Sequence, residues 1–288
     1  KTQTSTFEIG VNALPSFPKD STDRNRTSPF AFTGNRFEFR MVGSSDNIGC
    51  PNALLNTIVA EELDWFADKL EPVKNSERFE EEVKIVLKEV LKKHRRIIFN
   101  GDGYSKEWVL EAARRGLPNY PSVVDCMPHY TDEKNLKILH KHGIFNKNEV
   151  TARTEIHLEK YSKTRRIEAR TMVEMARKQL LPAGLDYLDK LCKSIATKNE
   201  IGITANTERK IAEKLTQLSD GLYESINRLE KLIAEACAIE EVQKQAEFYH
   251  DYVFAEMNIM REIADEMEVN MPLDSWPIPT YSEIIYNV

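Results

Sequence analysis

The 288-residue sequence has few of the features that mark several protein classes. Its four cysteines form no Cys-x-x-Cys pair, which argues against a zinc site or a disulfide framework. Its 40 Lys and Arg residues are outnumbered by 46 Asp and Glu, so the charge balance disfavours nucleic-acid binding and attraction to an anionic membrane. No apolar run approaches the roughly 20 residues of a membrane helix, and we find no signal peptide. We therefore expect a cytoplasmic globular protein.

A short strand carries the most informative pattern. Residues 35–41 alternate between polar and apolar, which predicts β structure with two distinct faces. Such a charged face is either a solvated ladder of little energetic value or part of a functional site. The apolar face comprises Phe37, Phe39 and Met41, and the charged face comprises Arg36, Glu38 and Arg40.

The residues around this strand resemble the glutamine synthetase family. Residues 25–27, Asn-Arg-Thr, precede the Arg-x-Glu-x-Arg strand at 36–40, as a similar element does in that family. Ala31 replaces a second arginine of the common bacterial form, and Val-Gly-Ser at 42–44 replaces its Pro-Asp-Pro; both departures match the type III branch. The similarity extends to FNGDGYS at 99–105, RGLPN at 115–119 and the tail WPIPTYSEIIYNV, and so covers essentially the whole chain.

The resemblance implies the ATP-dependent ligation of ammonia to glutamate through γ-glutamyl phosphate. Glu38 would bind the metal, Mg²⁺ or Mn²⁺, because hard cations prefer carboxylate oxygens. Arg26 and Arg36 would contact the ATP phosphates, with Arg26 also catalytic, and Arg40 would bind glutamate. Ala31 leaves part of the charge on the transferring phosphate without a partner, and Arg24 is the candidate substitute.

The resemblance also predicts that much of the active site lies elsewhere. The family's other metal-binding glutamates, its metal-binding histidine and its N-terminal β-grasp domain precede this region. We therefore expect the chain to be a segment excised from a longer enzyme and to be inactive by itself. The intact enzyme would be a large homo-oligomer of rings, with glutamate and ammonia as substrates and no nucleic-acid or membrane partner.

The fold class expected is mainly α. We assign residues 1–70 to the C-terminal part of the α/β catalytic domain, 71–270 to a helical region, and 271–288 to a proline-rich, aromatic tail packed on the body. A seam of apolar residues stepping by four and three predicts a helical bundle. The seam comprises Ile211, Leu215, Leu218, Leu222, Ile226, Leu229, Ile233 and Ala236.

Individual helix boundaries follow from capping and helix-breaking residues. A helix begins near Pro51, and Asn75 or Ser76 caps the next one, which ends in the basic run 92–96. A long helix runs from 148 to 181, where Pro182 breaks or kinks it. The last long helix spans residues 245–269.

Two further local features bear on the loops and the charged surfaces. Ser105 is expected to cap a helix that Gly116 ends. The charged residues at 165–170 share a helix that we expect to expose them to solvent; an anion-binding site is the alternative.

A second class of function competes with the enzyme. The chain would then be a non-catalytic helical interaction or regulatory module that keeps the arginine strand as structure. A nucleic-acid-binding bundle, a third class, is disfavoured by the acidic balance and by the mixed charge on every helix.

Overall fold

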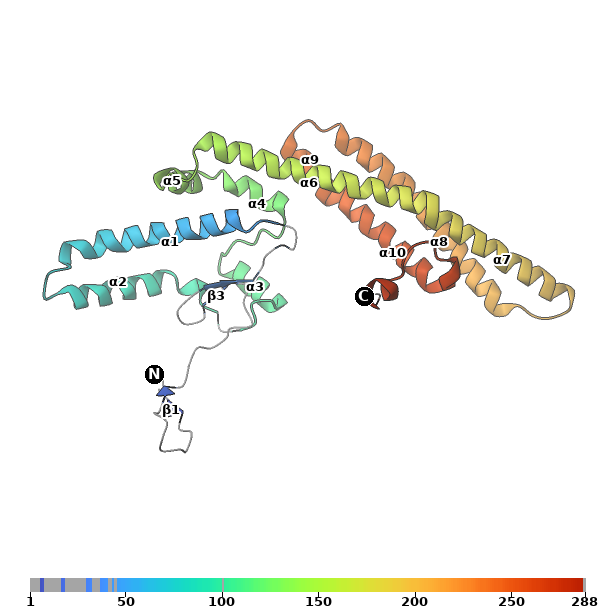
Figure 1. The fold of residues 1–288 in the computed structure, drawn as a ribbon, viewed down its shortest axis with the longest axis horizontal. Helices are drawn as coiled ribbons and strands as arrows, with labels where there is room; N and C mark the ends of the chain where they lie inside the picture. The colour runs from blue at the N-terminus through green and yellow to red at the C-terminus, as the bar shows by residue number, and fades with distance from the viewer. Residues whose placement is uncertain are drawn as a thin grey trace. The chain divides into compact units, whose positions relative to one another are not determined.

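The computed structural model describes residues 6–7, 17–18, 30–32, 37–40, 43, 46–99 and 101–286. Its contacts divide the chain into two compact units, residues 1–120 and residues 121–288. Most of the described residues are helical, so the expected mainly α fold class is confirmed (Figure 1). The finer assignment of 1–70, 71–270 and 271–288 to separate parts stays a prediction.

The first unit contains the described strands and three α-helices. Strand β1 (Thr6–Phe7) pairs antiparallel with β2 (Phe17–Pro18), and β3 (Phe30–Phe32) pairs antiparallel with β4 (Phe37–Phe39). The helices are α1 (Gly49–Leu70), α2 (Phe79–Lys93) and α3 (Lys106–Arg114), with short 3-10 turns at Glu71–Val73 and Arg95–Ile97.

Helix α2 begins later than its sequence suggests. The expected cap at Asn75 or Ser76 is wrong, because the helix starts after Arg78 without a side-chain cap. The Ser76 hydroxyl instead donates to the Val73 carbonyl, 2.9 Å away. Three glutamates in the first turn and Lys92 and Lys93 in the last turn complement the helix dipole, so the basic C-terminal end is confirmed.

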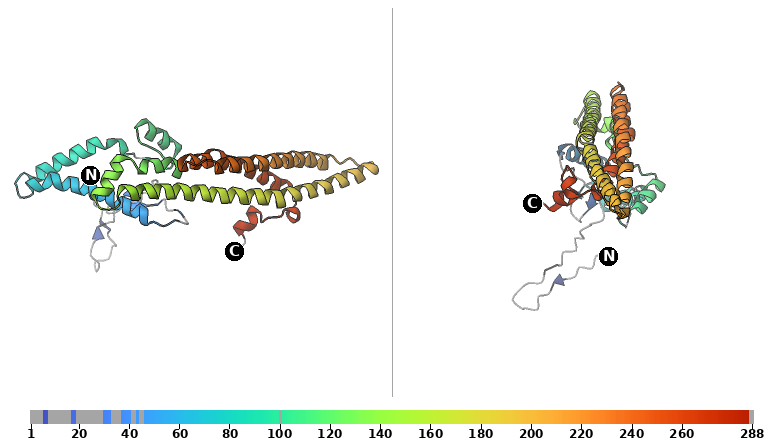
Figure 2. Two further views of the ribbon diagram at one scale, coloured as in Figure 1. Left: turned by 90° about the horizontal axis from the view of Figure 1, so that it is seen from above. Right: turned by 90° about the vertical axis from the view of Figure 1, so that its right-hand side faces the viewer.

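The second unit is an assembly of long helices (Figures 1 and 2). Two of its helical rods each contain a π-helical turn, Ala176–Leu180 in one and Tyr249–Val253 in the other. The α-helices are α4 (Val123–Tyr130), α5 (Glu133–Lys141), α6 (Lys147–Met175), α7 (Leu181–Glu200), α8 (Asn206–Cys237), α9 (Val242–Phe248), α10 (Phe254–Asn270) and α11 (Tyr281–Tyr286).

The π-helical turns bear on two expectations. The break considered at Pro182 is absent, whereas the alternative, a kink, stays a prediction. The chain stays helical through Pro182, which occupies the first turn of α7 directly after the turn at Ala176–Leu180. The wider turn replaces the break that a proline imposes on a regular α-helix. The rod expected at 245–269 likewise contains the π-helical turn Tyr249–Val253 between α9 and α10.

Helix α8 forms the centre of the second unit's core. It packs against α6, α7 and α10, and the seam expected from the sequence is confirmed. A charged group is buried beside it: Glu256 is 7% exposed and accepts hydrogen bonds from the hydroxyl of the buried Ser225 at 2.6 Å and from the Arg228 guanidinium at 3.2 Å. The buried seam residues are Leu215, Leu218, Leu222, Ile226, Leu229, Ile233 and Ala236.

The C-terminal residues return to this core. The 3-10 turn Leu273–Ser275 leads to Trp276, which is 8% exposed and belongs to the apolar cluster of the bundle. The Tyr281 hydroxyl donates to Asp265 of α10 at 3.0 Å. In the part of the chain that the structure describes, none of the helices is both long enough and apolar enough to cross a bilayer.

Truncating the centre of the seam should destabilise the second unit. We expect Leu222→Ala to lower the free energy of unfolding by about 2–5 kcal/mol, since it leaves a cavity at a fully buried position. Chemical denaturation followed by circular dichroism measures the change. The exposed neighbour Glu224→Ala is the control and should change stability little. Equal effects of the two variants would contradict the central place of α8.

Candidate functional site

The candidate site is built on β4, the strand identified from its charge alternation. In its ladder with β3, Phe30 lies opposite Phe39, Ala31 opposite Glu38, and Phe32 opposite Phe37. Strand β4 is shorter than the alternating segment 35–41 from which it was predicted. Its three paired residues are Phe37, Glu38 and Phe39. The register places position 31, where the common family form has an arginine, directly across from the proposed metal ligand.

Glu38 and Arg40 form an ion pair on this strand. The Arg40 guanidinium approaches Glu38 Oε2 through Nε at 3.2 Å and through an Nη at 2.8 Å. The two side chains are 30% and 24% exposed, respectively, and a pair so accessible to water contributes at most about 1 kcal/mol to stability. The pair agrees with a shared charged face but does not by itself assign a function to it.

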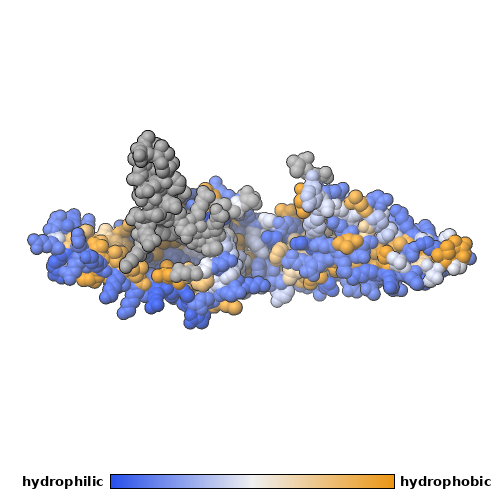
Figure 3. Space-filling view, turned by 90° about the horizontal axis from the view of Figure 1, so that it is seen from below, coloured by the Kyte–Doolittle hydropathy of each residue, from blue (hydrophilic) through white to orange (hydrophobic). Residues whose placement is uncertain are grey.

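The apolar side of the strand borders a groove of about 480 Å³. Phe37 and Phe39 line it together with the start of α1, and they are 59% and 39% exposed. Figure 3 shows hydrophobic residues reaching the surface among hydrophilic ones. The strand therefore presents apolar and charged side chains to solvent within this chain.

The other predicted site residues lie outside the described part of the structure. These are Arg26 and Arg36, the expected phosphate ligands, and Arg24, the proposed substitute for an arginine at position 31. The structure therefore brings together Glu38 and Arg40 of the candidate set. The roles of all four candidate residues stay predictions.

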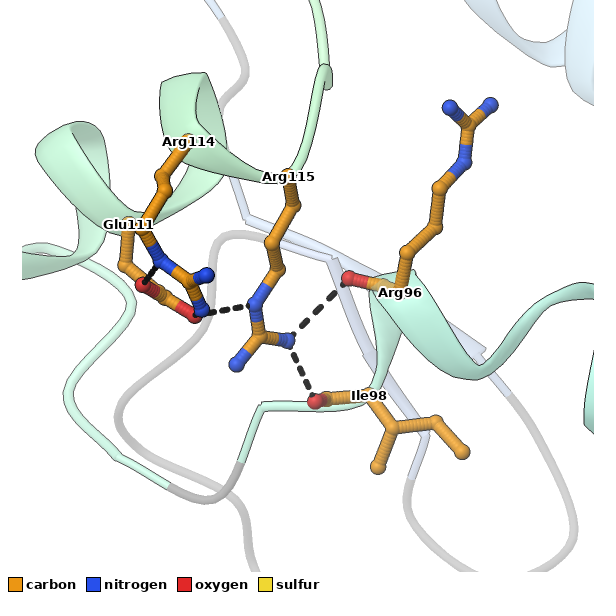
Figure 4. A network of polar contacts seen from close by, with 5 residues as sticks. All are labelled: Arg96, Ile98, Glu111, Arg114 and Arg115. Carbon is orange, nitrogen blue, oxygen red and sulfur yellow. Dashed lines mark hydrogen bonds and ion pairs between the residues drawn. The ribbon is translucent and has the colours of Figure 1, made fainter.

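A second polar cluster of the first unit is centred on Arg115, the first residue of the RGLPN segment (Figure 4). Arg115 donates from one Nη to the carbonyls of Arg96 at 3.1 Å and Ile98 at 2.8 Å, and from Nε to Glu111 at 2.5 Å. These carbonyls end the 3-10 turn after α2. One guanidinium thus ties the end of α3 to the chain segment that precedes it, a contact that we did not predict from the sequence.

Aromatic and backbone packing completes this cluster. Phe99 stacks on Trp108 with ring centroids 4.3 Å apart, and the Arg115 guanidinium lies over both rings. A Cβ on Gly101 would meet the Phe99 ring at 2.5 Å, so this glycine is required by close approach. Gly116 has a φ of 68°, which favours glycine where the helix ends.

The predicted helix cap at Ser105 is confirmed, because its Oγ accepts a hydrogen bond from the Trp108 backbone N–H at 3.2 Å. The termination of the helix at Gly116 is confirmed as well. Hydrogen bonds from Arg114 and Arg115 lower the pKa of Glu111 to about 2. The two sequence segments therefore form a structural module in this unit.

Comparison with known proteins supplies the family. Residues 82–199, from α2 to α7, match the family described as the glutamine synthetase C-terminal domain. This class of domain fits the mainly helical architecture of the region. Together with the relatives below, the match shows that the chain is similar to glutamine synthetases, and that residues 82–199 are similar to their C-terminal domain.

Three relatives match over nearly the whole chain. The Type-3 glutamine synthetase of Dictyostelium discoideum is 38% identical across 97% of this chain, and the glutamine synthetase of Butyrivibrio fibrisolvens is 38% identical across 94%. The glutamine synthetase of Bacteroides fragilis (strain YCH46) is 33% identical across 98%. The chain spans 39–40% of the length of these relatives. The resemblance to glutamine synthetases is thereby confirmed.

The Arg115 cluster makes a prediction about pH. Arg115→Gln should raise the pKa of Glu111 from about 2 toward the ordinary 4.5, because one hydrogen-bond donor to the carboxylate is removed. Since the folded pKa lies below 4.5, these bonds stabilise the unit above pH 4.5, and the stabilisation is lost as the pH falls toward 2.

A carboxyl titration by ¹³C NMR measures this pKa. Arg78→Gln is the matched control, since Arg78 flanks α2 and contributes none of the shift. A Glu111 pKa that stays near 2 in Arg115→Gln would contradict the hydrogen-bonding account.

Proposed function

We propose that the chain is the C-terminal part of a type III-like glutamine synthetase, an ATP-dependent ligase that joins ammonia to glutamate through γ-glutamyl phosphate. The observation that carries this proposal is the paired Glu38 and Arg40 on β4, within a chain that is similar along its length to glutamine synthetases. Glu38 carries a carboxylate, which is a ligand for hard cations, and the neighbouring Arg40 carries a planar guanidinium group, which binds carboxylates.

Each charged residue has a proposed role. Glu38 would hold the divalent metal, Mg²⁺ or Mn²⁺, which neutralises phosphate charge during phosphoryl transfer. Arg26 and Arg36 would bind the ATP phosphates, with Arg26 also stabilising the transferring group. Arg40 would orient the substrate glutamate through its guanidinium. The ion pair with Glu38 holds Arg40 at the side of the proposed metal ligand.

The residues of β4 fit a metal site that is completed from elsewhere. Mg²⁺ takes about six oxygen ligands, commonly one or two carboxylates with phosphate oxygens and waters, and Mn²⁺ suits the same ligand types; Glu38 offers one carboxylate on an accessible strand face. Further ligands would come from other parts of the intact enzyme. From the similarity to glutamine synthetases we propose that the intact enzyme is a homo-oligomer of rings with glutamate and ammonia as substrates. A cytoplasmic location stays a prediction.

The competing function is a helical interaction or regulatory module without catalysis. It is favoured by the position of the family match, since residues 82–199 exclude the strand that carries Glu38. The small energetic value of an accessible ion pair is also what a purely structural strand would show. The two functions differ in what they expect of Glu38.

Removing the Glu38 charge in the full-length protein separates them. We expect Glu38→Gln to weaken Mn²⁺ binding in the presence of ATP and to lower kcat on the order of 10²-fold or more, because a neutral amide is a poor ligand for a hard cation. Electron paramagnetic resonance of Mn²⁺ and a glutamine-formation assay measure the two effects. Glu62→Gln, at an exposed position of α1, is the charge-matched control. Unchanged Mn²⁺ binding in Glu38→Gln would favour the module.

The isolated chain should not form glutamine. One proposed metal carboxylate on β4 falls short of the coordination that phosphoryl transfer requires. An assay of the 288-residue chain with glutamate, ammonia, ATP and Mg²⁺ tests this, with a full-length type III enzyme as the positive control. Glutamine produced by the isolated chain above the rate without protein would overturn the proposal that the site is completed elsewhere.

A further inference from the structure

A polar groove of about 720 Å³ lies in the second unit between the end of α6, with its π-helical turn, and the last turns of α8. Its volume is in the range of small-molecule pockets, roughly 300–1,000 Å³. Apolar side chains of both helices line its floor, and charged side chains surround it. The charged residues are Arg166, Arg170, Glu174, Arg177, Lys178 and Glu230.

Half of these cations are already neutralised by neighbours. Arg177 binds Glu230 of α8 through two nitrogens at 2.5 and 2.7 Å. Lys178 contacts the Glu174 carboxylate at 2.7 Å. This end of the groove therefore carries two ion pairs and little net charge.

The other end carries two arginines with no neutralising carboxylate. Arg166 and Arg170 are exposed, lie one helical turn apart on α6, and have no carboxylate within ion-pair distance among the residues that the structure describes. Arg165, by contrast, contacts Glu168 at 2.7 Å and packs over Phe254. The charged face expected at 165–170 is thus divided, and its two unneutralised arginines line the groove.

The two arginines also act on a buried hydroxyl that lies beside a residue of the groove. Cys237 lines the groove, and its Sγ lies 3.6 Å from the buried Tyr249 hydroxyl. Burial raises the pKa of that hydroxyl, as does its contact with Cys237, while Arg166 and Arg170 act in the opposite direction. An anion in the groove would therefore meet a positive potential from one side.

We propose that this groove binds a small dianionic oxyanion, either a phosphate group or a dicarboxylate, between Arg166 and Arg170. Guanidinium groups bind both chemistries through paired hydrogen bonds. Arginines at i and i+4 have neighbouring side chains, so one compact ligand can reach both. Glu174 and Glu230 at the far end disfavour a long polyanion, whose charge would extend past them. The proposal does not depend on strand β4 or on the ligase function.

Titration of the chain with inorganic phosphate and, separately, with glutarate tests the proposal. Calorimetry at constant ionic strength, with chloride as the balancing anion, removes general screening effects. We expect saturable 1:1 binding of at least one probe. Binding of phosphate alone assigns a phosphorylated ligand, and binding of glutarate alone assigns a dicarboxylate.

Matched variants locate the binding. The double variant Arg166→Gln/Arg170→Gln should weaken it at least tenfold. Arg209→Gln/Lys210→Gln removes the same charge from the first turn of α8, outside the groove, and should leave binding unchanged. Glu174→Gln should tighten binding a few fold, since it removes a negative charge and frees Lys178.

Two results would overturn the proposal. One is the absence of saturable binding by both probes. The other is an equal loss of affinity for the probe in the two double variants, because binding would then depend on the total charge of the chain and not on the groove. Impaired folding could weaken binding in a variant but could not tighten it. The tighter binding expected of Glu174→Gln is therefore a test that a folding defect cannot imitate.

Discussion

The burial of one face of α8 is the constraint on which the second unit depends. Its apolar residues step by four and three and are largely shielded from water between α6, α7 and α10. Each such side chain contributes roughly 1.5–3 kcal/mol when fully buried, so the seam dominates the stability of the bundle. Ser225 and Arg228 on the same helix satisfy the buried carboxylate of Glu256, which would otherwise be costly to desolvate. The polar groove lined by Arg166 and Arg170 lies where the end of α8 packs against α6.

The first unit is stabilised differently. Thr57 is the buried residue of the 22-residue helix α1, whereas apolar side chains such as Ile58 and Leu63 are more than half exposed. Polar and aromatic contacts, centred on Arg115, hold the end of α2 to α3. Strand β4 is accessible on its charged and its apolar sides. Such a surface suits a segment whose partners come from the rest of a larger enzyme.

Residue periodicity and helix-capping residues correctly predicted the features that depend on local sequence. The α8 seam, the cap at Ser105 and the end at Gly116 follow from side-chain spacing or from the conformation of single residues. The π-helical turns were missed because they adjust the rods to the packing of Ala176 and Tyr249 in the core. The start of α2 was misplaced because Ser76 has competing backbone partners.

Less of the two polar sites could be predicted from the residues alone. The Arg115 contacts join residues 17 and 19 positions apart, and no periodic pattern marks such pairs. On the charged face at 165–170, Arg165 differs from the other arginines because it pairs with Glu168 and packs over Phe254. The contact with Phe254 joins distant parts of the sequence, so the spacing of charges does not predict it. For the candidate site on β4, the alternation at 35–41 identified Glu38 and Arg40 as neighbours. Their roles derive from the family resemblance, because an ion pair between such side chains is common without catalysis.

We propose that the helical bundle is stable by itself, whereas strand β4 and the start of α1 are completed by other parts of a longer synthetase. Hydrogen–deuterium exchange of the isolated chain and of a full-length synthetase tests it most directly. We expect the amides of the α8 seam to exchange most slowly in both. Those of β4 and the start of α1 should exchange quickly in the isolated chain and slowly in the full-length enzyme. Protection of β4 equal to that of α8 in the isolated chain would contradict the account.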